Sequence, residues 1–328
     1  MKKALICGVS GQDGAYLAQF LLGKGYQVWG TSRDAQVANF SNLEALDIKD
    51  QVHLLSMAQN DFRSVLNTLT RSDPDEVYFL SGQSSVSLSF DQPAESIDST
   101  VYGVLNLLEA IRFLDKKIKL YNASSSECFG EVPQGQFSDE LSPFRPRSPY
   151  GVAKSSAHWL VTNYRESYGL FCCNGILFNH ESPLRPERFV TRKIVSTACR
   201  IKSGSKERLQ LGRIDIARDW GWAPDYVEAL WRMLQADLPD DYVIATGASH
   251  TLEDFVNQVF LILGLEWHDH VDLDASLVRP SEILNSAANP LKSSDCLGWR
   301  AQTIFPQLIE KLISYELARQ SGASEGLS

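Results

Sequence analysis

Short apolar runs alternate with segments of helical periodicity through the first half of the chain. Runs with the length and composition of buried strands lie at residues 4–7, 26–30, 52–55, 76–80, 118–123 and 172–178. Segments whose apolar residues recur at helical spacing lie between them, at residues 16–22, 62–69, 94–114 and 150–168. This alternation predicts an α/β fold with a doubly wound parallel sheet, covered by helices on both faces.

The pattern becomes irregular after about Asn179. Prolines interrupt the apolar segments of the second half, at Pro183, Pro186, Pro224, Pro239, Pro280, Pro290 and Pro306. We therefore predict two parts. Residues 1–178 form the doubly wound sheet, and residues 179–328 form a smaller, mixed α/β C-terminal domain.

Composition and charge narrow the classes of function. The 328 residues carry a formal net charge of −9, so the chain gains little from counterion release and we expect no nucleic-acid partner. No apolar stretch approaches the ~18 residues of a membrane helix, so we expect no membrane contact and a cytoplasmic location. The six cysteines include no C-x-x-C pair, which favours buried, reduced thiols over disulfides, and we predict no metal site.

A glycine-rich turn follows the first predicted strand and leads into the first predicted helix. It contains Gly8, Gly11 and Gly14, with Gln12 and Asp13 before the last glycine. Glycines let the strand turn sharply and let the backbone approach a pyrophosphate, which the helix N-terminus then binds. A tight turn without a ligand would also use glycines, but this position after the first strand favours a Rossmann-type dinucleotide site.

The end of the second predicted strand carries Arg33 followed by Asp34. An acidic residue at this point binds the ribose 2′-hydroxyl of NAD, whereas an Arg binds the 2′-phosphate of NADP. Because a guanidinium can form two hydrogen bonds with a phosphate, we predict NADP as the cofactor and Arg33 as one of its ligands. NAD stays as the alternative.

Tyr150 and Lys154 stand four residues apart in a predicted helix, so they share one face. We expect the lysine charge to lower the pKa of the phenol toward neutrality, which suits a base that deprotonates a sugar hydroxyl. Such pairs are common by chance on helix surfaces. The preceding strand, however, ends in a run that includes Ser125 and Glu127, and these supply a hydroxyl and a carboxylate to the same site.

These motifs resemble those of the extended short-chain dehydrogenase/reductase family and, within it, the GDP-mannose 4,6-dehydratase group. The resemblance covers nearly the whole chain. The segments that carry it are GVSGQDGAYL, PDEVY, ASSSECFG, RPRSPYGVAK, NYRESYG, NGILFNHESPLRPERFVTRK, RDWGWAPDYVEA, DDYVIATG and RPSEI. The glycine turn and the Tyr-Lys pair are shared with epimerases, whereas NHESP and RDWG are typical of the dehydratase group.

The resemblance implies a mechanism. Ser125 would bind the hydroxyl on carbon 4 of a hexose, and Tyr150, supported by Lys154, would deprotonate it while hydride passes to NADP. Glu127 would then take the proton from carbon 5 and pass it to the hydroxyl leaving from carbon 6. A carboxylate on the cavity rim without a catalytic role is the alternative for Glu127.

The resemblance also implies a binding site for a nucleotide sugar. The residues that match substrate positions of the family are Ser85, Asn179, Glu181, Arg185, Lys193, Arg218 and Arg279. A diphosphate is best bound by Arg and Lys side chains, although any one of these arginines could instead form a surface salt bridge. The family's usual Asp near adenine is Ala58 here, so we expect Asp61 or the backbone to replace it. Pairing of helices in relatives implies a homodimer or homotetramer.

The sequence therefore predicts an NADP-dependent hydro-lyase, a nucleotide-sugar 4,6-dehydratase with a GDP-hexose as the favoured substrate. Another dehydratase or an epimerase of the same family is the first alternative. A non-catalytic NADP-binding protein is the second, but such a protein would not need the residues of the predicted catalytic site.

Overall fold

A seven-stranded parallel sheet forms the centre of the computed structural model, which describes residues 1–322. The strand order is β10-β6-β5-β4-β1-β2-β3. The strands are β1 (Lys3–Cys7), β2 (Gln27–Ser32), β3 (His53–Ser56), β4 (Glu76–Phe79), β5 (Lys119–Ser125), β6 (Cys172–Leu177) and β10 (Tyr242–Ile244). This order confirms the predicted doubly wound, Rossmann-type sheet, whose direction of winding changes between β1 and β4.

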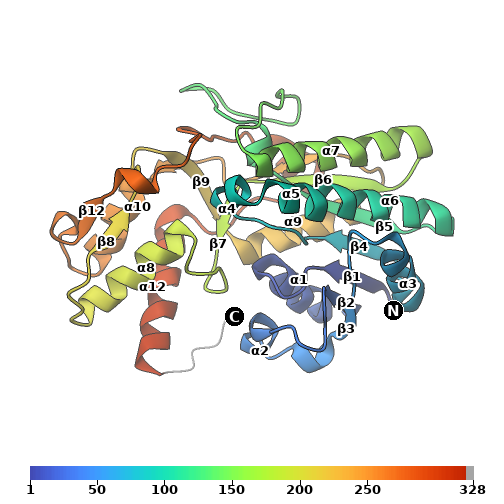
Figure 1. Cartoon of the computed structure of the whole chain (residues 1–328), viewed down its shortest axis with the longest axis horizontal. Helices are drawn as coiled ribbons and strands as arrows, with labels where there is room; N and C mark the ends of the chain where they lie inside the picture. The colour runs from blue at the N-terminus through green and yellow to red at the C-terminus, as the bar shows by residue number, and fades with distance from the viewer. Residues whose placement is uncertain (323–328) are drawn as a thin grey trace.

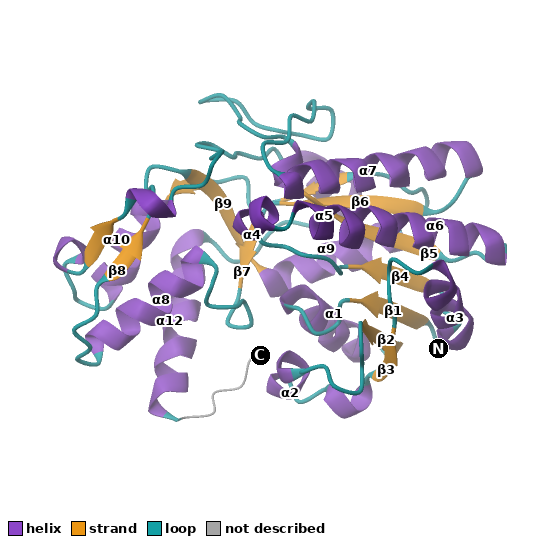
Figure 2. Ribbon diagram, viewed as in Figure 1, coloured by secondary structure: helices purple, strands orange, loops and turns teal. Residues whose placement is uncertain are grey.

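Helices cover both faces of the sheet (Figures 1 and 2). One face carries α1 (Gln12–Gly23), α2 (Ser41–Ala45), α9 (Ala223–Gln235) and α11 (Leu291–Leu297), and the other carries α3 (Phe62–Ser72), α6 (Gly103–Leu114) and α7 (Pro149–Tyr168). Successive strand residues point to opposite faces. In β1, Ala4 and Ile6 therefore join the core on one side, while Leu5 and Cys7 join the core on the other.

The predicted helix at 94–114 is a helical run in three parts. It begins as α5 (Pro93–Ile97), continues through a π-helical turn, η2 (Asp98–Tyr102), and ends as α6. Within residues 1–178, two short α-helices were not predicted, α2 and α4 (Val86–Asp91). They are five and six residues long, too short for an apolar period to be recognised.

The C-terminal part has a core of its own, which lies to one side of the large sheet (Figure 1). Its small sheets contain β7 (Asn179–Glu181), β9 (Ala217–Trp222) and β11 (Ser249–Thr251), and β8 (Leu209–Leu211) with β12 (Val271–Leu273). Its helices are α8 (Val190–Lys202), α10 (Leu252–Ile262) and α12 (Phe305–Ser321). The chain also returns to the large sheet, because α9 packs on it and β10 pairs with β6. The division at residue 178 stays a prediction about roles, and residues 323–328 lie outside the described part.

Residues 1–322 contain no candidate membrane helix, no cluster of metal ligands and no disulfide. No helix in this range is long and apolar enough to cross a membrane. No group of three or more His, Cys, Asp or Glu side chains in this range is placed to hold a metal ion. The cysteines in the same range are free thiols, all buried except Cys296, which is exposed.

Candidate active site

A cavity of about 1020 Å³ lies where the carboxyl ends of β1, β4, β5 and β6 face the C-terminal part. All the site residues predicted from the sequence line it: Gly8, Gly11, Gln12, Asp13, Gly14, Arg33, Ser85, Ser125, Glu127, Tyr150, Lys154, Asn179, Glu181, Arg185, Lys193, Arg218 and Arg279. Ligands of doubly wound sheets bind at this edge, next to the point where the winding direction changes. The structure therefore brings the predicted residues together, although their individual roles stay predictions.

The glycine turn forms one wall of this cavity. Gly8 has a φ of +86°, which favours glycine, and a Cβ there would lie 3.0 Å from the backbone of Ser81. A Cβ on Gly14 would collide with the carbonyl oxygen of Gly8. Helix α1 begins directly after Gly11, so its first N–H groups and the positive end of its dipole face the cavity. The glycine turn and the N-terminus of α1 therefore fit a pyrophosphate.

Gln12 and Asp13 bind the start of the C-terminal part rather than projecting freely into the cavity. Asp13 lies 2.9 Å from Nε2 of His180, and the Gln12 amide donates to the His180 carbonyl at 3.3 Å and accepts from Ser182 at 2.7 Å. Burial opposes ionisation of Asp13, but His180 outweighs it and lowers the pKa of this carboxyl to about 2. The same contact raises the pKa of His180 against the effect of its burial. His180 was not predicted from the sequence, although it lies within the NHESP segment.

Arg33 lies at the cavity edge and Asp34 does not line the cavity. The Arg33 side chain is 84% exposed, and its only charged partner within the described residues is Glu95, at 3.4 Å. Asp34 instead accepts a hydrogen bond from the backbone N–H of Gln36. The guanidinium is thus the charged group of this pair that is available to a ligand.

Asp61 does not replace the acidic residue that the family has near adenine. Its side chain caps the N-terminus of α3 by accepting from the N–H of Arg63, and it does not line the cavity. The neighbouring Ala58, Gln59 and Asn60 line the cavity instead. Of the two replacements expected from the sequence, Asp61 and the backbone, only the backbone of this loop remains.

Tyr150 and Lys154 lie one turn apart at the start of α7. Ser148 caps this helix by accepting from the N–H of Gly151 at 3.0 Å, and Pro149 occupies its first position. The buried Lys154 ammonium donates to the carbonyl of Ala123 at 2.7 Å and lies 5.8 Å from the centre of the Tyr150 ring. The shared face predicted from the sequence is confirmed.

The expected lowering of the tyrosine pKa is wrong for the ligand-free chain. Burial raises the pKa of Tyr150, and the hydrogen bond with Ser125 offsets this only in part, while the negative charge of Glu127 adds to it. Burial also lowers the pKa of Lys154 to about 8. The spacing of two residues on a helix does not reveal desolvation, which is the dominant effect here.

Ser125 and Glu127 follow directly at the end of β5. The Ser125 hydroxyl accepts from the backbone N–H of Glu127 at 3.2 Å, which starts the short helix η3 (Ser126–Cys128). Burial raises the pKa of Glu127, and the positive charges of Arg218 and Arg279 oppose this shift. A raised pKa makes a carboxylate a stronger base, which suits a group that takes up a proton and returns it.

Arginine–carboxylate pairs form the opposite wall. The carboxylate of Glu282 lies 3.2 Å from Arg218 and 3.3 Å from Arg279, and Arg279 also donates to the hydroxyl of Ser87 at 3.0 Å. Arg218 is 5% exposed. Glu282 was not predicted from the sequence, although it belongs to the RPSEI segment. Two guanidinium groups held together in one cavity are suited to bind a diphosphate.

Four other predicted substrate residues also have side-chain partners within the chain. Glu181 forms an ion pair with Arg185 at 2.9 Å and accepts from Thr191 at 2.6 Å. Lys193 donates to the carbonyl of Gln210 at 2.6 Å. Ser85 caps α4. Contacts of these side chains with a nucleotide sugar stay predictions.

Comparisons with known proteins agree with this geometry. The family model for GDP-mannose 4,6 dehydratase matches residues 5–312. GDP-mannose 4,6 dehydratase 2 of Arabidopsis thaliana is 46% identical, over 96% of this chain and 87% of the relative. GDP-mannose 4,6-dehydratase of Vibrio cholerae serotype O1 is 40% identical, over 96% and 94% respectively.

Solved structures show the same fold. UDP-glucose 4-epimerase of Thermus thermophilus, in complex with NAD, superposes with a TM-score of 0.84 at 25% identity and covers 96% of this chain and 98% of that one. DesIV, a dTDP-glucose 4,6-dehydratase from Streptomyces venezuelae, has a TM-score of 0.86 at 20% identity and covers 99% and 100%. From the match over nearly its full length, the chain belongs to the GDP-mannose 4,6-dehydratase family.

Proposed function

We propose that this chain is a hydro-lyase that converts GDP-mannose to GDP-4-dehydro-6-deoxy-D-mannose, with NADP as its cofactor. The observation that carries the proposal is the meeting of Ser125, Glu127, Tyr150 and Lys154 in one cavity with the glycine turn. Relatives named GDP-mannose 4,6-dehydratase, 40% and 46% identical over nearly the whole chain, support the choice of substrate.

The residues around the glycine turn fit a nicotinamide dinucleotide. The narrow cradle of Gly8 and Gly14 and the N-terminus of α1 would hold its pyrophosphate, and Lys154 would hold its ribose. The bound cofactor supplies the site that accepts hydride from carbon 4 and returns it to carbon 6. Solved structures of this fold include complexes with NAD and with NADPH. The exposed Arg33 guanidinium supports NADP rather than NAD.

The first half of the reaction uses the pair on α7. Tyr150 takes the proton of the hydroxyl on carbon 4, and Ser125, beside it, positions that oxygen. Because burial raises the pKa of Tyr150, the positive charge of Lys154 and of the oxidised cofactor is needed to stabilise the phenolate. Lys154 is fixed for this purpose by its hydrogen bond to Ala123.

The second half uses Glu127. The ketone at carbon 4 acidifies the proton on carbon 5, which Glu127 removes as a carboxylate. The protonated Glu127 then donates this proton to the hydroxyl that leaves from carbon 6 as water. When hydride returns to carbon 6, carbon 5 takes up a proton from solvent, and Tyr150 releases to solvent the proton that it took from the hydroxyl on carbon 4. Its raised pKa suits both steps, because it makes the carboxylate a stronger base and keeps the acid form accessible.

We also propose that the protein works in the cytoplasm as a homodimer or homotetramer. Helices α6 and α7 lie side by side and expose large apolar side chains, among them Phe113, Val152, Trp159 and Tyr168. Such groups favour an interface. Light scattering of the purified protein tests this; a monomer at micromolar concentration would contradict it.

Incubation with GDP-, UDP-, CDP- and dTDP-hexoses, followed by mass spectrometry, tests the reaction and the substrate together. We expect GDP-mannose to lose one water, with NADP needed only in catalytic amount. A product of unchanged mass with altered stereochemistry would identify an epimerase instead. No product from any sugar nucleotide, while NADP still binds, would identify a non-catalytic protein.

A further inference from the structure

The face of α7 that carries Tyr150 and Lys154 continues one turn further to His158. This histidine is 4% exposed, and Nδ1 of its ring lies 3.2 Å from the hydroxyl of Ser124 on β5. Its other nitrogen, Nε2, lies 3.5 Å from a carboxylate oxygen of Asp241. The imidazole thus stands between a hydroxyl that lines the cavity and a buried carboxylate that lies behind it.

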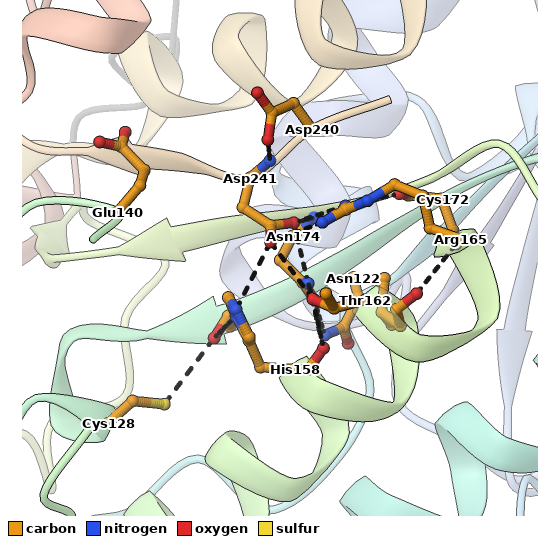
Figure 3. Close-up of polar contacts among 12 residues, drawn as sticks. Asn122, Cys128, Glu140, His158, Thr162, Arg165, Cys172, Asn174, Asp240 and Asp241 are labelled. Atoms are coloured by element: carbon orange, nitrogen blue, oxygen red, sulfur yellow. Dashed lines mark hydrogen bonds and ion pairs between the residues drawn. The ribbon is translucent and has the colours of Figure 1, made fainter. Parts of the chain in front are cut away.

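The carboxylate of Asp241 is held by two elements of the fold, α7 and β6. Arg165 of α7 donates to both of its oxygens at 2.8 Å, and the backbone and side-chain N–H groups of Asn174 on β6 donate to one of them at 3.0 Å. Asp241 itself stands directly before β10. Figure 3 shows these contacts around Asp241, with His158 on the side that leads toward Cys128.

The charges around His158 determine which group donates in its hydrogen bond with Ser124. Burial lowers the pKa of His158 to about 4, against the opposing charge of Asp241, so the ring is neutral at neutral pH. Burial disfavours the charge of Asp241, but Arg165 and the N–H donors hold the pKa of this carboxyl below its ordinary value. A neutral ring beside a carboxylate carries its proton on Nε2, so Nδ1 accepts and Ser124 donates.

Ser124 occupies a central place in the proposed catalytic strand. It stands between Ala123, whose carbonyl holds Lys154, and Ser125. Its oxygen also lies 3.8 Å from the sulfur of Cys128, the residue after Glu127. Any shift of Ser124 would therefore move the support of the lysine and the proposed proton-transfer groups together.

We propose that His158 is a positioning residue for the dehydratase reaction. Through its hydrogen bond with Ser124 and its contact with Asp241, it keeps the end of β5 in register with the reactive face of α7. The inference rests on the proposed function, because it concerns the geometry of that same site. His158 does not touch the cavity, so it acts only through Ser124.

Two variants of His158 separate this role from simple packing. In His158→Asn, the amide oxygen can take the place of Nδ1 and keep the contact with Ser124. In His158→Gln, the amide nitrogen can take the place of Nε2 and keep the contact with Asp241, but the acceptor for Ser124 is lost. The two side chains are both uncharged amides, so they control for loss of the ring.

We expect His158→Gln to lower kcat for GDP-mannose by about 10-fold to 100-fold, with little change in KM or in the affinity for NADP. His158→Asn should restore most of kcat. In a Ser124→Ala background, His158→Gln should cause no further loss, since the contact through which it acts is already gone. Thermal melting of all variants shows whether any loss of kcat reflects unfolding.

The inference is overturned if His158→Gln keeps the wild-type kcat, or if the kcat of His158→Asn is as low as that of His158→Gln. It is also overturned if the losses of kcat from Ser124→Ala and His158→Gln are additive in the double variant. A ¹⁵N NMR spectrum in which His158 is protonated on Nδ1 would also overturn it, independently of catalysis. If the wild-type protein does not dehydrate GDP-mannose, the proposed function fails instead. The sugar nucleotide that it does convert then replaces GDP-mannose in the same comparison, and if it converts none, the positioning role falls as well.

Discussion

The two walls of the cavity are built differently. The wall that contains the glycine turn, where we propose the cofactor binds, is called the cofactor wall. It consists of strand ends and a helix N-terminus, where backbone N–H groups are available as donors and Gly8 and Gly14 leave room for a ligand close to the backbone. The opposite wall, where we propose the substrate binds, is called the substrate wall. It consists of charged side chains from distant segments, and Glu282 forms ion pairs with its arginines Arg218 and Arg279. The first wall is preorganised by the fold. The second must exchange its own ion pairs for those of a ligand, so the effects of substitution should differ between the two.

The largest effect is expected for Tyr150→Phe. This change removes the group that we propose deprotonates the hydroxyl on carbon 4, so kcat should fall by at least about 10³-fold, within the range for loss of a catalytic base. NADP binding, measured by fluorescence titration, should persist, because the cofactor wall binds its ligand mainly through backbone groups. Tyr168→Phe, at the exposed end of the same helix, serves as the control. Undiminished turnover in Tyr150→Phe would exclude the phenol from the mechanism.

Glu127→Gln should lower kcat by about 10²-fold to 10⁴-fold. The amide cannot take the proton from carbon 5, so deuterium from heavy water should no longer enter that position, as measured by NMR of the product and the recovered substrate. Glu166→Gln, an exposed change on α7 with the same alteration of charge, should leave exchange unaffected. Normal exchange in Glu127→Gln would mean that another base acts at carbon 5.

Arg33→Ala tests the guanidinium that we propose binds the 2′-phosphate of NADP. The dissociation constant of NADP should rise by about 10-fold to 100-fold, because a charge-assisted contact is lost, while that of NAD changes little. Isothermal titration calorimetry with both cofactors provides the measurement. Arg63→Ala, another exposed arginine, should change neither value. Equal weakening of NADP and NAD would show that Arg33 does not bind the 2′-phosphate.

Glu282→Gln should have the smallest effect on activity and is the most direct test of the substrate wall. It frees Arg218 and Arg279 from their shared carboxylate, so GDP should bind severalfold more tightly. The ligand-free protein should lose about 1–3 kcal/mol of stability, because two guanidinium groups lose a charged partner. Denaturant unfolding with and without GDP measures both. Glu266→Gln, which alters an exposed carboxylate, controls for net charge. Weaker GDP binding in Glu282→Gln would indicate that Glu282 contacts the ligand itself.

The same contrast explains what the sequence could predict. The strands of the large sheet, the glycine turn and the Tyr150–Lys154 face are local patterns, in which a few neighbouring residues determine the outcome. The resemblance to the dehydratase group then indicated residues that local patterns alone could not place, among them Arg218 and Arg279, and these line the same cavity.

The features that were not predicted from the sequence depend on contacts between distant segments. His180 and Glu282 acquire their surroundings from Asp13 and from the arginines of the opposite wall, and no local spacing indicates those pairs. The short strand β10 joins the large sheet far from its neighbours in sequence. The pKa of Tyr150 was predicted in the wrong direction because burial, the largest cause of its shift, is a property of the folded chain.

The transfer of hydrogen within one sugar is the central claim. GDP-mannose that carries both deuterium at carbon 4 and carbon-13 in its hexose, mixed with an equal amount of unlabelled substrate and a trace of NADP, tests it directly. We predict that the deuterium appears at carbon 6 of the product molecules that carry carbon-13, and not in the others. Deuterium that remains at carbon 4, or that is lost to solvent, would contradict the account.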